Sequence, residues 1–438
     1  MPSNRKHASV AELSLWGKSV GAVAWDTERQ IASFEYQPAF IRSGLQIAPL
    51  TMPLRPGIFT FPTLRRETFR GLPGLLSDSL PDRFGNRLID LWLQQQGRDV
   101  KDFSPVERLC YIGSCGMGAL EFKPALAKAS TAQTSVDIAE LASLAREILA
   151  ERFSLSANLN HESATALNTI IRVGTSAGGA RAKAVLNWNR LTGEIRSGQI
   201  PVTPGFEPWL LKFDGVNDAA LGDPQGFGRI EFAYHKMAVA SDIQMSACHL
   251  LEEGGRAHFM TRRFDRTEAG DRIHMQSLCA MAHYDFNEPG AYGYEQAFFV
   301  IQQLNLGYPA LQEMYRRMVF NVLARNQDDH TRNIAFLMDS SGRWTLAPAF
   351  DVIWSHNPDG QWTNSHQLRV NGKRDGFTRD DLQEVAIQFG IKGADRMIET
   401  VAAVVARWPD FARESAVPEA MTRRIAASHR LYLAGEHG

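Results

Sequence analysis

The sequence has few cysteines and no long apolar run. Its 438 residues include only four cysteines, which is too few for a fold built on disulfide bonds. Nowhere does the chain contain the roughly 18 consecutive apolar residues of a membrane-spanning helix, and residues 1–21 lack the apolar stretch of a signal peptide. We therefore expect a cytoplasmic protein with reduced cysteines and no membrane partner.

The sequence also lacks an excess of charge of one sign. It has 47 lysines and arginines against 48 aspartates and glutamates, for a formal net charge of −1. A protein that holds DNA or an anionic membrane through its overall charge has a positive excess. This balance argues against that mode of binding, and leaves a local basic patch or binding through a partner protein.

The apolar pattern predicts a mixed α and β chain. Short strands are expected within residues 8–36, where apolar residues alternate with others, and a helix within 74–97 that Asp82 could cap. A small, polar segment at 127–138 is the best candidate for a linker. Helices are also expected at 136–153 and 161–171. Beyond about residue 292 the pattern is mostly helical, with a strong amphipathic helix at 309–325, although residues 344–354 are expected to form a strand with a polar end.

A glycine-rich segment occupies residues 174–183, between two apolar runs. Glycines there would let backbone N–H groups come close to a phosphate, although the spacing is not that of the phosphate-binding P-loop. Taken alone, the segment fits equally a plain glycine hairpin with a surface lysine.

Lys212 stands in an otherwise apolar strand, beside Leu211 and Phe213. A buried lysine needs an anion, and either a nucleotide phosphate or Glu231 could serve. The alternative is that Lys212 lies on the solvent face of an amphipathic strand.

The strongest signal is the pair Asp328 and Asn333, five positions apart, followed by Asp351 after a short predicted hairpin. The spacing matches the D-x-x-x-x-N catalytic loop of kinases. Phosphoryl transfer needs a base for the incoming hydroxyl and hard oxygen ligands for Mg²⁺, and these three side chains supply both. The alternative is a polar loop between helix and strand. The order of glycine-rich segment, strand lysine and acidic loop favours the kinase.

As a set, these motifs resemble the HipA family of kinase toxins from bacterial type II toxin–antitoxin systems. The matching segments, each similar to a family motif, are SAGGARAK (176–183), RRFDR (262–266), NQDDHTRN (326–333), AFDVI (349–353) and, in the N-terminal part, SDSLPDRFGNRLI (77–89).

The resemblance implies an α+β, protein-kinase-like, two-lobed fold. An N-terminal β-rich subdomain would span 1–130, a kinase N-lobe with the glycine-rich loop 131–257, and a mostly helical C-lobe with the catalytic loop 258–438.

The resemblance also implies an ATP- and Mg²⁺-dependent, non-specific serine/threonine protein kinase. Asp328 would be the catalytic base, Asn333 and Asp351 would hold Mg²⁺, and Ser176 would be autophosphorylated. The residues implied to contact ATP are Gly178, Gly179, Ala180, Arg181, Ala182, Lys183, Lys212, Arg262, Arg263, Phe264, His330, Thr331, Arg332, Asn333, Phe350 and Asp351.

Two positions depart from the family pattern. Arg262 stands in the hinge where the best-known member has an acidic residue, so adenine recognition would rest on backbone contacts. Asp329 replaces a glycine after the catalytic aspartate, and is either an extra charge near the metal or a solvated loop residue.

The expected partners are a small helix-turn-helix antitoxin that carries the DNA binding, and a protein substrate such as an aminoacyl-tRNA synthetase. Two alternatives remain: a small-molecule kinase of the aminoglycoside-phosphotransferase type, and a non-catalytic pseudokinase that acts as a co-repressor. The intact set of Asp328, Asn333 and Asp351 argues against the pseudokinase.

Overall fold

The computed structural model describes residues 9–126, 136–149, 170, 174, 181–216 and 226–435. The chain forms two compact units. Unit 1 comprises Met1–Gln225, Leu251–Met275 and Met338–Gly342, and unit 2 comprises Gly226–Leu250, Gln276–Leu337 and Arg343–Gly438. The predicted helix at 161–171 and most of the predicted linker lie outside the described residues.

Unit 1 begins with an antiparallel sheet of strand order β4-β3-β2-β1-β5. The first three strands confirm the prediction for residues 8–36, because Ala11, Leu13 and Leu15 alternate inward along the first of them. In chain order the strands are β1 (Val10–Leu15), β2 (Lys18–Asp26), β3 (Ile31–Tyr36), β4 (Ile58–Phe59) and β5 (Leu120–Lys123).

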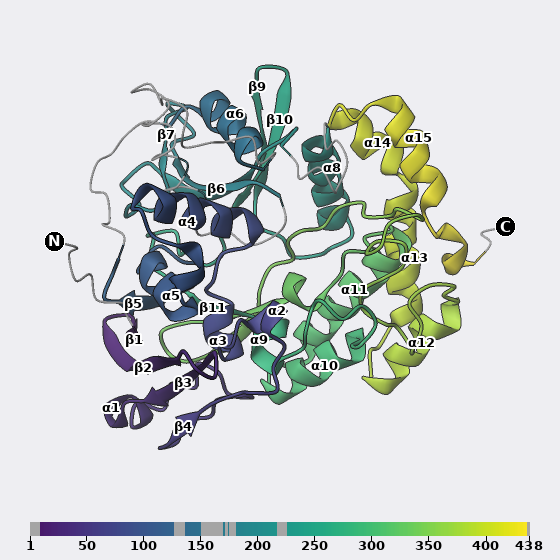
Figure 1. The fold of residues 1–438 in the computed structure, drawn as a ribbon. Coiled ribbons are helices and arrows are strands. Elements are labelled where there is room, and N and C mark those ends of the chain that lie inside the picture. Colours follow the sequence, from purple (N-terminus) through teal and green to yellow (C-terminus); the bar gives the residue numbers. More distant parts are fainter. Residues whose placement is uncertain are drawn as a thin grey trace. The chain divides into compact units, whose positions relative to one another are not determined.

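The second sheet of unit 1 has the order β7-β6-β8-β10-β9. One face packs on a helical layer, in which Phe84 and Leu88 of α4 share a core with Leu186 and Leu211 of the sheet (Figure 1). Its strands are β6 (Lys183–Trp188), β7 (Ile195–Ser197), β8 (Glu207–Lys212), β9 (Cys248–Glu253) and β10 (Arg256–Arg262).

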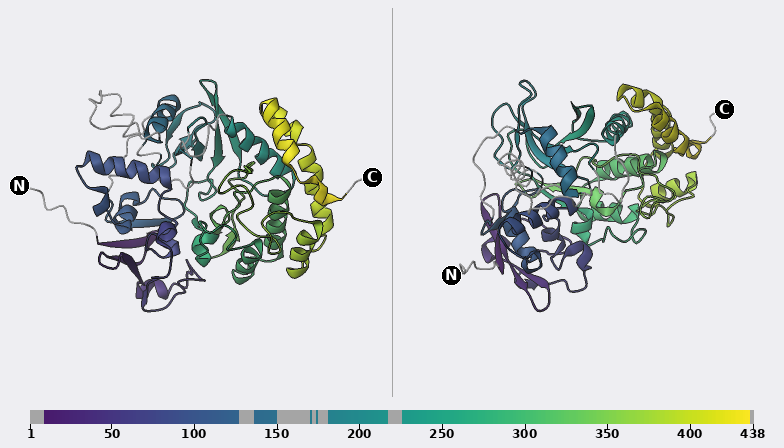
Figure 2. Two further views of the ribbon diagram at one scale, coloured as in Figure 1. Left: turned by 45° about the vertical axis from the view of Figure 1, so that its right-hand side comes forward. Right: turned by 45° about the horizontal axis from the view of Figure 1, so that its top comes forward.

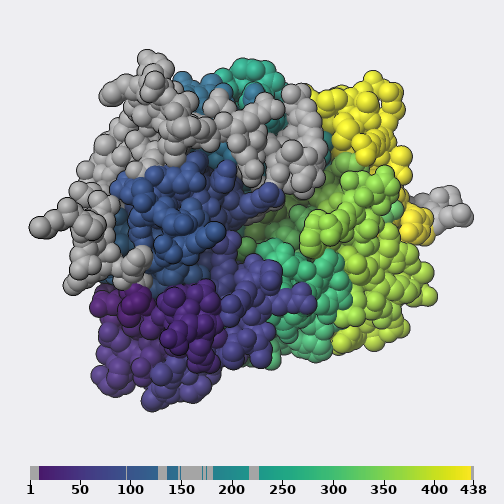
Figure 3. Space-filling view, viewed as in Figure 1, coloured from purple at the N-terminus to yellow at the C-terminus, as the bar shows by residue number. Residues whose placement is uncertain are grey.

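The helix α4 starts as the sequence predicts. The Asp82 side chain accepts a hydrogen bond from the backbone N–H of Gly85 at 2.8 Å, which satisfies a donor that the first helical turn leaves open. Figure 3 shows α4 and α5 as a blue surface next to the purple strands of the first sheet. The helices are α1 (Pro38–Ile41), α2 (Arg66–Phe69), α3 (Gly74–Ser77), α4 (Arg83–Gln95), η1 (Val100–Asp102), α5 (Pro105–Ile112) and α6 (Ile138–Leu149).

Unit 2 is mostly helical, as the sequence predicts. The predicted amphipathic helix at 309–325 is α11, whose inward residues include Met318 and Phe320, and Figure 2 shows α14 and α15 side by side in yellow. The helices are α8 (Phe227–Ala240), α9 (Leu278–Ala282), α10 (Tyr294–Gln303), α11 (Tyr308–Leu323), η2 (Thr331–Asn333), α12 (Arg379–Gln388), α13 (Ala394–Ala406), α14 (Trp408–Glu414), α15 (Glu419–Ser428) and η3 (Leu431–Ala434).

A third sheet has the order β11 (His274–Ser277), β12 (Ala335–Met338) and β13 (Trp344–Leu346). The sequence predicts a longer last strand, over 344–354. The strand ends at Leu346 because Pro348 has no N–H to give to a sheet, and the residues that follow form a loop.

The chain is therefore a mixed α/β protein with a β-rich N-terminal region and a mostly helical C-terminal part, as predicted. Among the described residues, no helix is both long and apolar enough to cross a membrane.

Candidate active site

The predicted catalytic loop follows α11 in unit 2 and closes on itself. The Asn333 side chain donates a hydrogen bond from Nδ2 to the backbone oxygen of Asp328 at 2.7 Å, and the N–H of Asn333 donates to the oxygen of His330 at 2.9 Å. The five-residue spacing is therefore a structural requirement, because it lets the asparagine hold the main chain of the aspartate from the other end of the loop.

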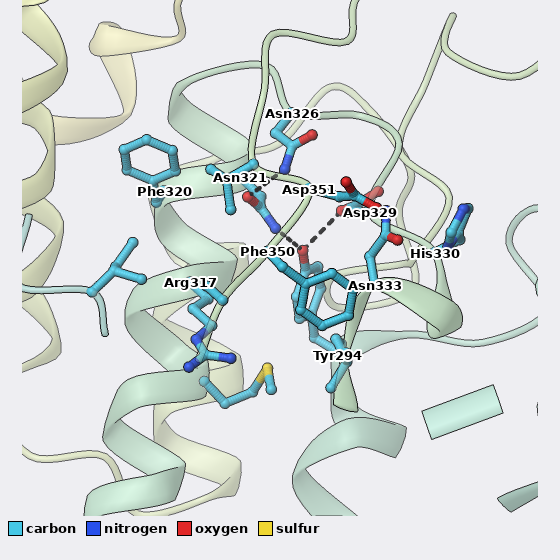
Figure 4. Close-up of a pocket in the computed structure, with 15 residues that line it drawn as sticks. Tyr294, Arg317, Phe320, Asn321, Asn326, Asp329, His330, Asn333, Phe350 and Asp351 are labelled. Atoms are coloured by element: carbon cyan, nitrogen blue, oxygen red, sulfur yellow. Dashed lines mark hydrogen bonds between the residues drawn. The ribbon is translucent and has the colours of Figure 1, made fainter. Parts of the chain in front are cut away.

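Asn333 and Asp351 line the same pocket, although 18 positions separate them in the chain. The pocket has an empty volume of about 460 Å³, which includes space open to solvent, and Figure 4 shows the side chains that surround it. The lining residues are Ile243, Tyr294, Met314, Arg317, Phe320, Asn321, Asn326, Asp329, His330, Asn333, Ile334, Ala349, Phe350, Asp351 and Val352.

Asp351 has a left-handed backbone, with φ of 52°. Aspartate tolerates this conformation better than most residues, but it still costs free energy relative to the common regions. Two residues earlier, the N–H of Ala349 donates to the oxygen of Gln244 at 2.8 Å, which fixes the start of the loop. Strain of this kind concentrates at functional sites, so the conformation agrees with a ligand role for Asp351.

Asp328 is accessible to solvent, with 47% of its side chain exposed, against 21% for His330. The Nε2 atom of His330 lies 3.9 Å from its Oδ1 atom. Next to them, Thr331 donates from its hydroxyl to the oxygen of Tyr284 at 2.7 Å, and the Arg332 guanidinium lies 5.0 Å from the centre of the Phe286 ring. The predicted base is thus accessible on a loop that its neighbours hold in place.

Asp329 is buried, so its interpretation as a solvated loop residue is wrong. Its carboxylate accepts hydrogen bonds from the Tyr294 hydroxyl (2.9 Å), from His366 Nδ1 (2.7 Å) and from the N–H of Gln367 (2.8 Å). Burial alone raises the pKa of Asp329, but the electrostatic interaction and hydrogen bond with His366, together with the other donors, lower it below its ordinary value. Asp329 therefore remains an anion beside Asp328, the predicted catalytic base.

Arg317 in the pocket wall was missed by sequence reasoning. It forms a buried ion pair with Glu313, four residues earlier on α11, with 2.8 Å between Arg317 Nε and Glu313 Oε1. It also donates to the backbone oxygen of Ala347 at 2.9 Å, and thereby fixes the loop that carries Asp351. An opposite-charge pair spaced i, i+4 within the predicted amphipathic helix is the signal that could have found it. Nothing in the sequence indicated Tyr294 or Asn321, and Asn326 was included in the NQDDHTRN segment without a role of its own.

In unit 1, Lys183 and Lys212 face each other on neighbouring strands. They are direct partners in the antiparallel pairing of β6 with β8, so their side chains leave the same face of the sheet. Both are buried, with 3% and 8% of their surface exposed, and Lys212 Nζ lies 5.5 Å from the centre of the Phe259 ring. The prediction of a buried strand lysine is confirmed, and the solvent-face alternative is wrong.

Glu231, the predicted partner of Lys212, is buried on α8 in unit 2. The pairing itself stays a prediction. Of the glycine-rich segment, Ser176, Gly178, Gly179 and Ala180 lie outside the described residues.

The described end of that segment comprises a half-buried Arg181 and a buried Ala182. Gly174, at its start, is packed so closely that an added Cβ atom would lie 2.5 Å from Leu88 Cδ1 and 3.0 Å from Phe84 Cε1. This glycine is therefore required by its contact with α4.

The predicted hinge residues Arg262 and Phe264 are half-buried at the end of β10, whereas Arg263 is buried. The Arg263 guanidinium donates to both carboxylate oxygens of Asp265, at 2.9 and 2.8 Å. The Arg263 side chain is thus committed to a buried ion pair within its own segment, and its predicted contact with ATP stays a prediction.

No three His, Cys, Asp or Glu side chains among the described residues are grouped so that they could hold a metal ion. The pocket does bring one carboxylate, from Asp351, together with the amide of Asn333. Mg²⁺ in nucleotide sites is commonly held by one or two carboxylates plus phosphate oxygens, so this donor set fits Mg²⁺ bound together with a nucleotide and does not fit a metal cage made by protein alone.

Comparison with known families agrees with this arrangement of motifs. Residues 175–408 match the model of the HipA-like C-terminal domain, and residues 11–123 match that of the HipA N-terminal domain. The chain belongs to the HipA family. The first match alone spans more than half of the sequence and includes the glycine-rich segment, Lys212, the catalytic loop and Asp351.

A solved HipA structure shares the fold. HipA of Shewanella oneidensis MR-1, in a complex with HipB and operator DNA, is 16% identical, with a TM-score of 0.67 over 97% of this chain and 96% of that one. A Helicobacter pylori structure, the proinflammatory kinase CtkA, is 12% identical over 54% of this chain and 92% of its own, and its TM-score of 0.35 is too low to carry an argument.

Among curated proteins, a Haemophilus influenzae protein named "Putative kinase" is 31% identical over 120 residues. The match covers 26% of this chain, and the chain spans about a third (35%) of the length of that relative.

Proposed function

We propose that this HipA-family protein is an ATP-dependent serine/threonine kinase and the toxin of a HipBA-like toxin–antitoxin module. The observation that carries the proposal is that Asn333 and Asp351 share one pocket, while Asn333 also holds the main chain of Asp328. One carboxylate, one amide oxygen and one accessible carboxylate are the minimum set for phosphoryl transfer from a metal-bound nucleotide.

In the proposed reaction, the Asp328 carboxylate accepts the proton of a serine or threonine hydroxyl. The hydroxyl oxygen then forms a bond to the γ-phosphorus of ATP as the bond to the ADP oxygen breaks. The exposure of Asp328 lets a protein substrate reach it, and the bond from Asn333 keeps its backbone in place. Asn333 and Asp351 would hold Mg²⁺, which neutralises charge on the phosphates.

Two buried lysines support an anionic ligand in unit 1. Lys183 and Lys212 leave the same face of the second sheet, and two lysines at one place concentrate positive charge, which favours an anionic group there. We assign the ATP phosphates to this face because its two lysines and the glycine-rich segment that ends at Lys183 bring positive charge and backbone N–H groups together.

The partner is proposed to be a HipB-like helix-turn-helix antitoxin. The Shewanella relative was solved together with HipB and its operator DNA, and the near-neutral charge of this chain fits DNA binding through such a partner. The protein substrate, by the family resemblance, is a translation component such as an aminoacyl-tRNA synthetase.

The test of the activity is the mass of the intact protein, and of candidate substrates, after incubation with Mg²⁺ and ATP. Asp328→Asn should lower the rate by about 10²–10⁴-fold, because the base is lost, and should leave the circular dichroism spectrum unchanged. Asp359→Asn, in an exposed loop of unit 2, is the matched control and should retain the rate. Near wild-type phosphorylation by Asp328→Asn would remove Asp328 from the mechanism.

The metal assignment is tested by calorimetry of nucleotide binding with and without Mg²⁺. Hard oxygen ligands predict that Mg²⁺ or Mn²⁺ is required and that Zn²⁺ does not replace them. Asp351→Ala should abolish the Mg²⁺ effect on binding. If this variant bound and turned over Mg²⁺-ATP normally, the assignment of Asp351 would be wrong.

We also propose that Ser176 is autophosphorylated and that this shuts the enzyme off. A phosphate there adds about −1.5 to −2 charges at pH 7, which would repel the phosphates of ATP. Tandem mass spectrometry after incubation with Mg²⁺-ATP locates the modification. Phosphate found only on other residues, or unchanged ATP affinity of the modified protein, would contradict the switch.

A further inference from the structure

A chain of buried hydrogen bonds connects the C-terminal segment of unit 2 to the catalytic loop. Arg430 lies just before η3 and its side chain is 1% exposed. Its Nη1 atom donates to His366 Nε2 at 2.9 Å, and His366 Nδ1 lies 2.7 Å from Asp329 Oδ2. His366 is completely buried and Asp329 nearly so. The direct neighbour of the catalytic base is thus connected to a residue about 100 positions further along the chain.

The hydrogen bonds define the protonation state of His366. A guanidinium has only donors, so the Nε2 atom that it contacts must accept. The one proton of the neutral ring is therefore on Nδ1, where it is donated to Asp329. Arg430 thereby fixes the tautomer that Asp329 needs, and its own charge is balanced by Asp375, to which Nη2 donates.

Arg430 is itself held against the helix that precedes the loop. Its backbone N–H donates to the oxygen of Leu323 and its Nη1 to the oxygen of Val322, both at 2.9 Å. These carbonyls belong to the last turn of α11, which has no helical partner for them. Arg430 therefore connects the end of α11 to His366 and, through His366, to Asp329 in the loop that follows α11.

On the side of the pocket, Asp329 is part of a row of hydrogen-bonded side chains in the pocket wall. Tyr294 donates to Asp329, Asn321 Nδ2 donates to the Tyr294 hydroxyl at 2.8 Å, and Asn326 Nδ2 donates to Asn321 Oδ1 at 3.0 Å. Figure 4 shows this row of side chains between α11 and the loop. With donors on both sides, the Asp329 carboxylate has little freedom to turn towards a metal.

We propose that His366 and Arg430 are positioning residues for phosphoryl transfer, and that they act through Asp329 to hold Asp328 in its reactive orientation. Asp329 is then an anchor of the catalytic loop and is not a metal ligand. This inference rests on the proposed kinase function. It goes beyond it by giving a defined role to residues outside the motif.

Two variants of His366 test the roles of its two ring nitrogen atoms separately. In His366→Asn the amide N–H stands near the position of Nδ1, so the donor to Asp329 is kept. In His366→Gln the amide N–H stands near the position of Nε2. The donor to Asp329 is then lost, and Arg430 faces an N–H group in place of an acceptor. We expect His366→Gln to lower kcat by about 10–100-fold, since small misplacements of reacting groups are costly, and His366→Asn to stay within about threefold of the wild type.

The ATP affinity should not change in either variant, because none of the three residues is assigned to the nucleotide. A purely structural role would instead lower the folded fraction and leave kcat per folded molecule unchanged. The double variant His366→Gln/Asp329→Asn should be no slower than Asp329→Asn alone, because a residue that acts through another adds nothing once that residue is removed.

Arg430→Met should behave like His366→Gln, and Arg379→Met is the matched control. Arg379 also anchors the C-terminal segment, through the oxygen of Ala434, but among the described residues its other hydrogen bonds go to Asp395 and Glu399. We expect wild-type kcat from Arg379→Met. Equal losses of kcat in both arginine variants would show that any loosening of the C-terminal segment has the same effect. That result would overturn the role of the hydrogen bonds from Arg430 through His366 to Asp329.

Hydrogen–deuterium exchange gives a readout that needs no activity. His366→Gln should speed exchange in peptides that span residues 326–333, and His366→Asn should not. If the wild type phosphorylated nothing but this exchange pattern appeared, the proposed function would fall and the anchoring would stand. If the wild type were active, and His366→Gln changed neither kcat nor exchange, the anchoring would be wrong and the kinase would stand.

Discussion

Each unit contains a fully buried aspartate, and the two are stabilised in opposite ways. Asp265 of unit 1 is held by two cations: Arg263 and Arg266 each approach it to 2.8 Å, and the N–H of Gly118 donates to it at 2.7 Å. Asp329 of unit 2 has no arginine or lysine among its hydrogen-bond donors, which are a hydroxyl, an amide and an imidazole.

The difference follows from what each carboxylate does. Burial raises the pKa of Asp265, but the charges of Arg263 and Arg266 outweigh it and hold the pKa far below its ordinary value. Asp265 thus connects residues 262–266, at the end of β10, to the backbone of the bend at Gly118. Asp329 keeps its charge through directional donors, which fix its orientation as well as its ionisation, next to the proposed catalytic base Asp328.

The largest effect on stability is expected from removing the buried negative charge of Asp265 in unit 1. Asp265→Asn leaves Arg263 and Arg266 buried with no counter-charge, and should lower the free energy of unfolding by about 3–5 kcal/mol. Asp329→Asn removes only hydrogen-bond acceptance from neutral donors and should cost about 1–3 kcal/mol. Urea denaturation of both variants measures the contrast. Equal losses would mean that the nature of the donors does not matter.

A smaller effect on stability is expected from pH, because the shifted pKa values of His274 and Asp265 in unit 1 act in different pH ranges. Burial lowers the pKa of His274 to about 4, below the unfolded value of about 6.5. As pH falls below about 6.5 the unfolded chain binds a proton that the folded chain does not, so stability is lost between pH 6.5 and 4, by about 1.4 kcal/mol per pH unit. The lowered pKa of Asp265 affects stability in a more acidic pH range. Its contribution is present above the unfolded value of about 3.9 and is lost as pH falls below it.

The check is His274→Gln, whose amide can keep the hydrogen bond from His274 Nε2 to the oxygen of Ile47 (3.1 Å). Urea midpoints measured from pH 7 to pH 5 should depend on pH less steeply in this variant, by about one proton. An unchanged slope would show that His274 is protonated in the folded state.

The smallest effect is expected at an exposed ion pair of unit 1. Arg196 Nε lies 2.6 Å from Glu194 Oε1, with 18% and 37% of the side chains exposed. Solvent screens such a pair, so Glu194→Gln should change stability by at most about 1 kcal/mol, despite a distance shorter than any at Asp265. A loss as large as that of Asp265→Asn would show that distance, and not burial, decides the strength of these pairs.

Local chemistry allowed much of this protein to be predicted. The cap at Asp82, the amphipathic helix at 308–323 and the strand around Lys212 all follow from short-range patterns, and each is found where expected. The loop from Asp328 to Asn333 was singled out by its spacing, and the structure shows that Asn333 holds the backbone of Asp328 across that spacing. The last strand was predicted too long, since the alternation of apolar residues continues past the proline that ends it.

Spacing, capping and periodicity determined by themselves which segments are helices and strands, and which polar residues are candidates for chemistry, because these depend on neighbours within a few positions. Only the tertiary structure decided that Lys183 is the partner of Lys212, that Asp329 is buried, and that Arg430 and His366 connect to the catalytic loop. Each of these depends on residues that are far apart in the chain and that meet only when strands pair or helices pack.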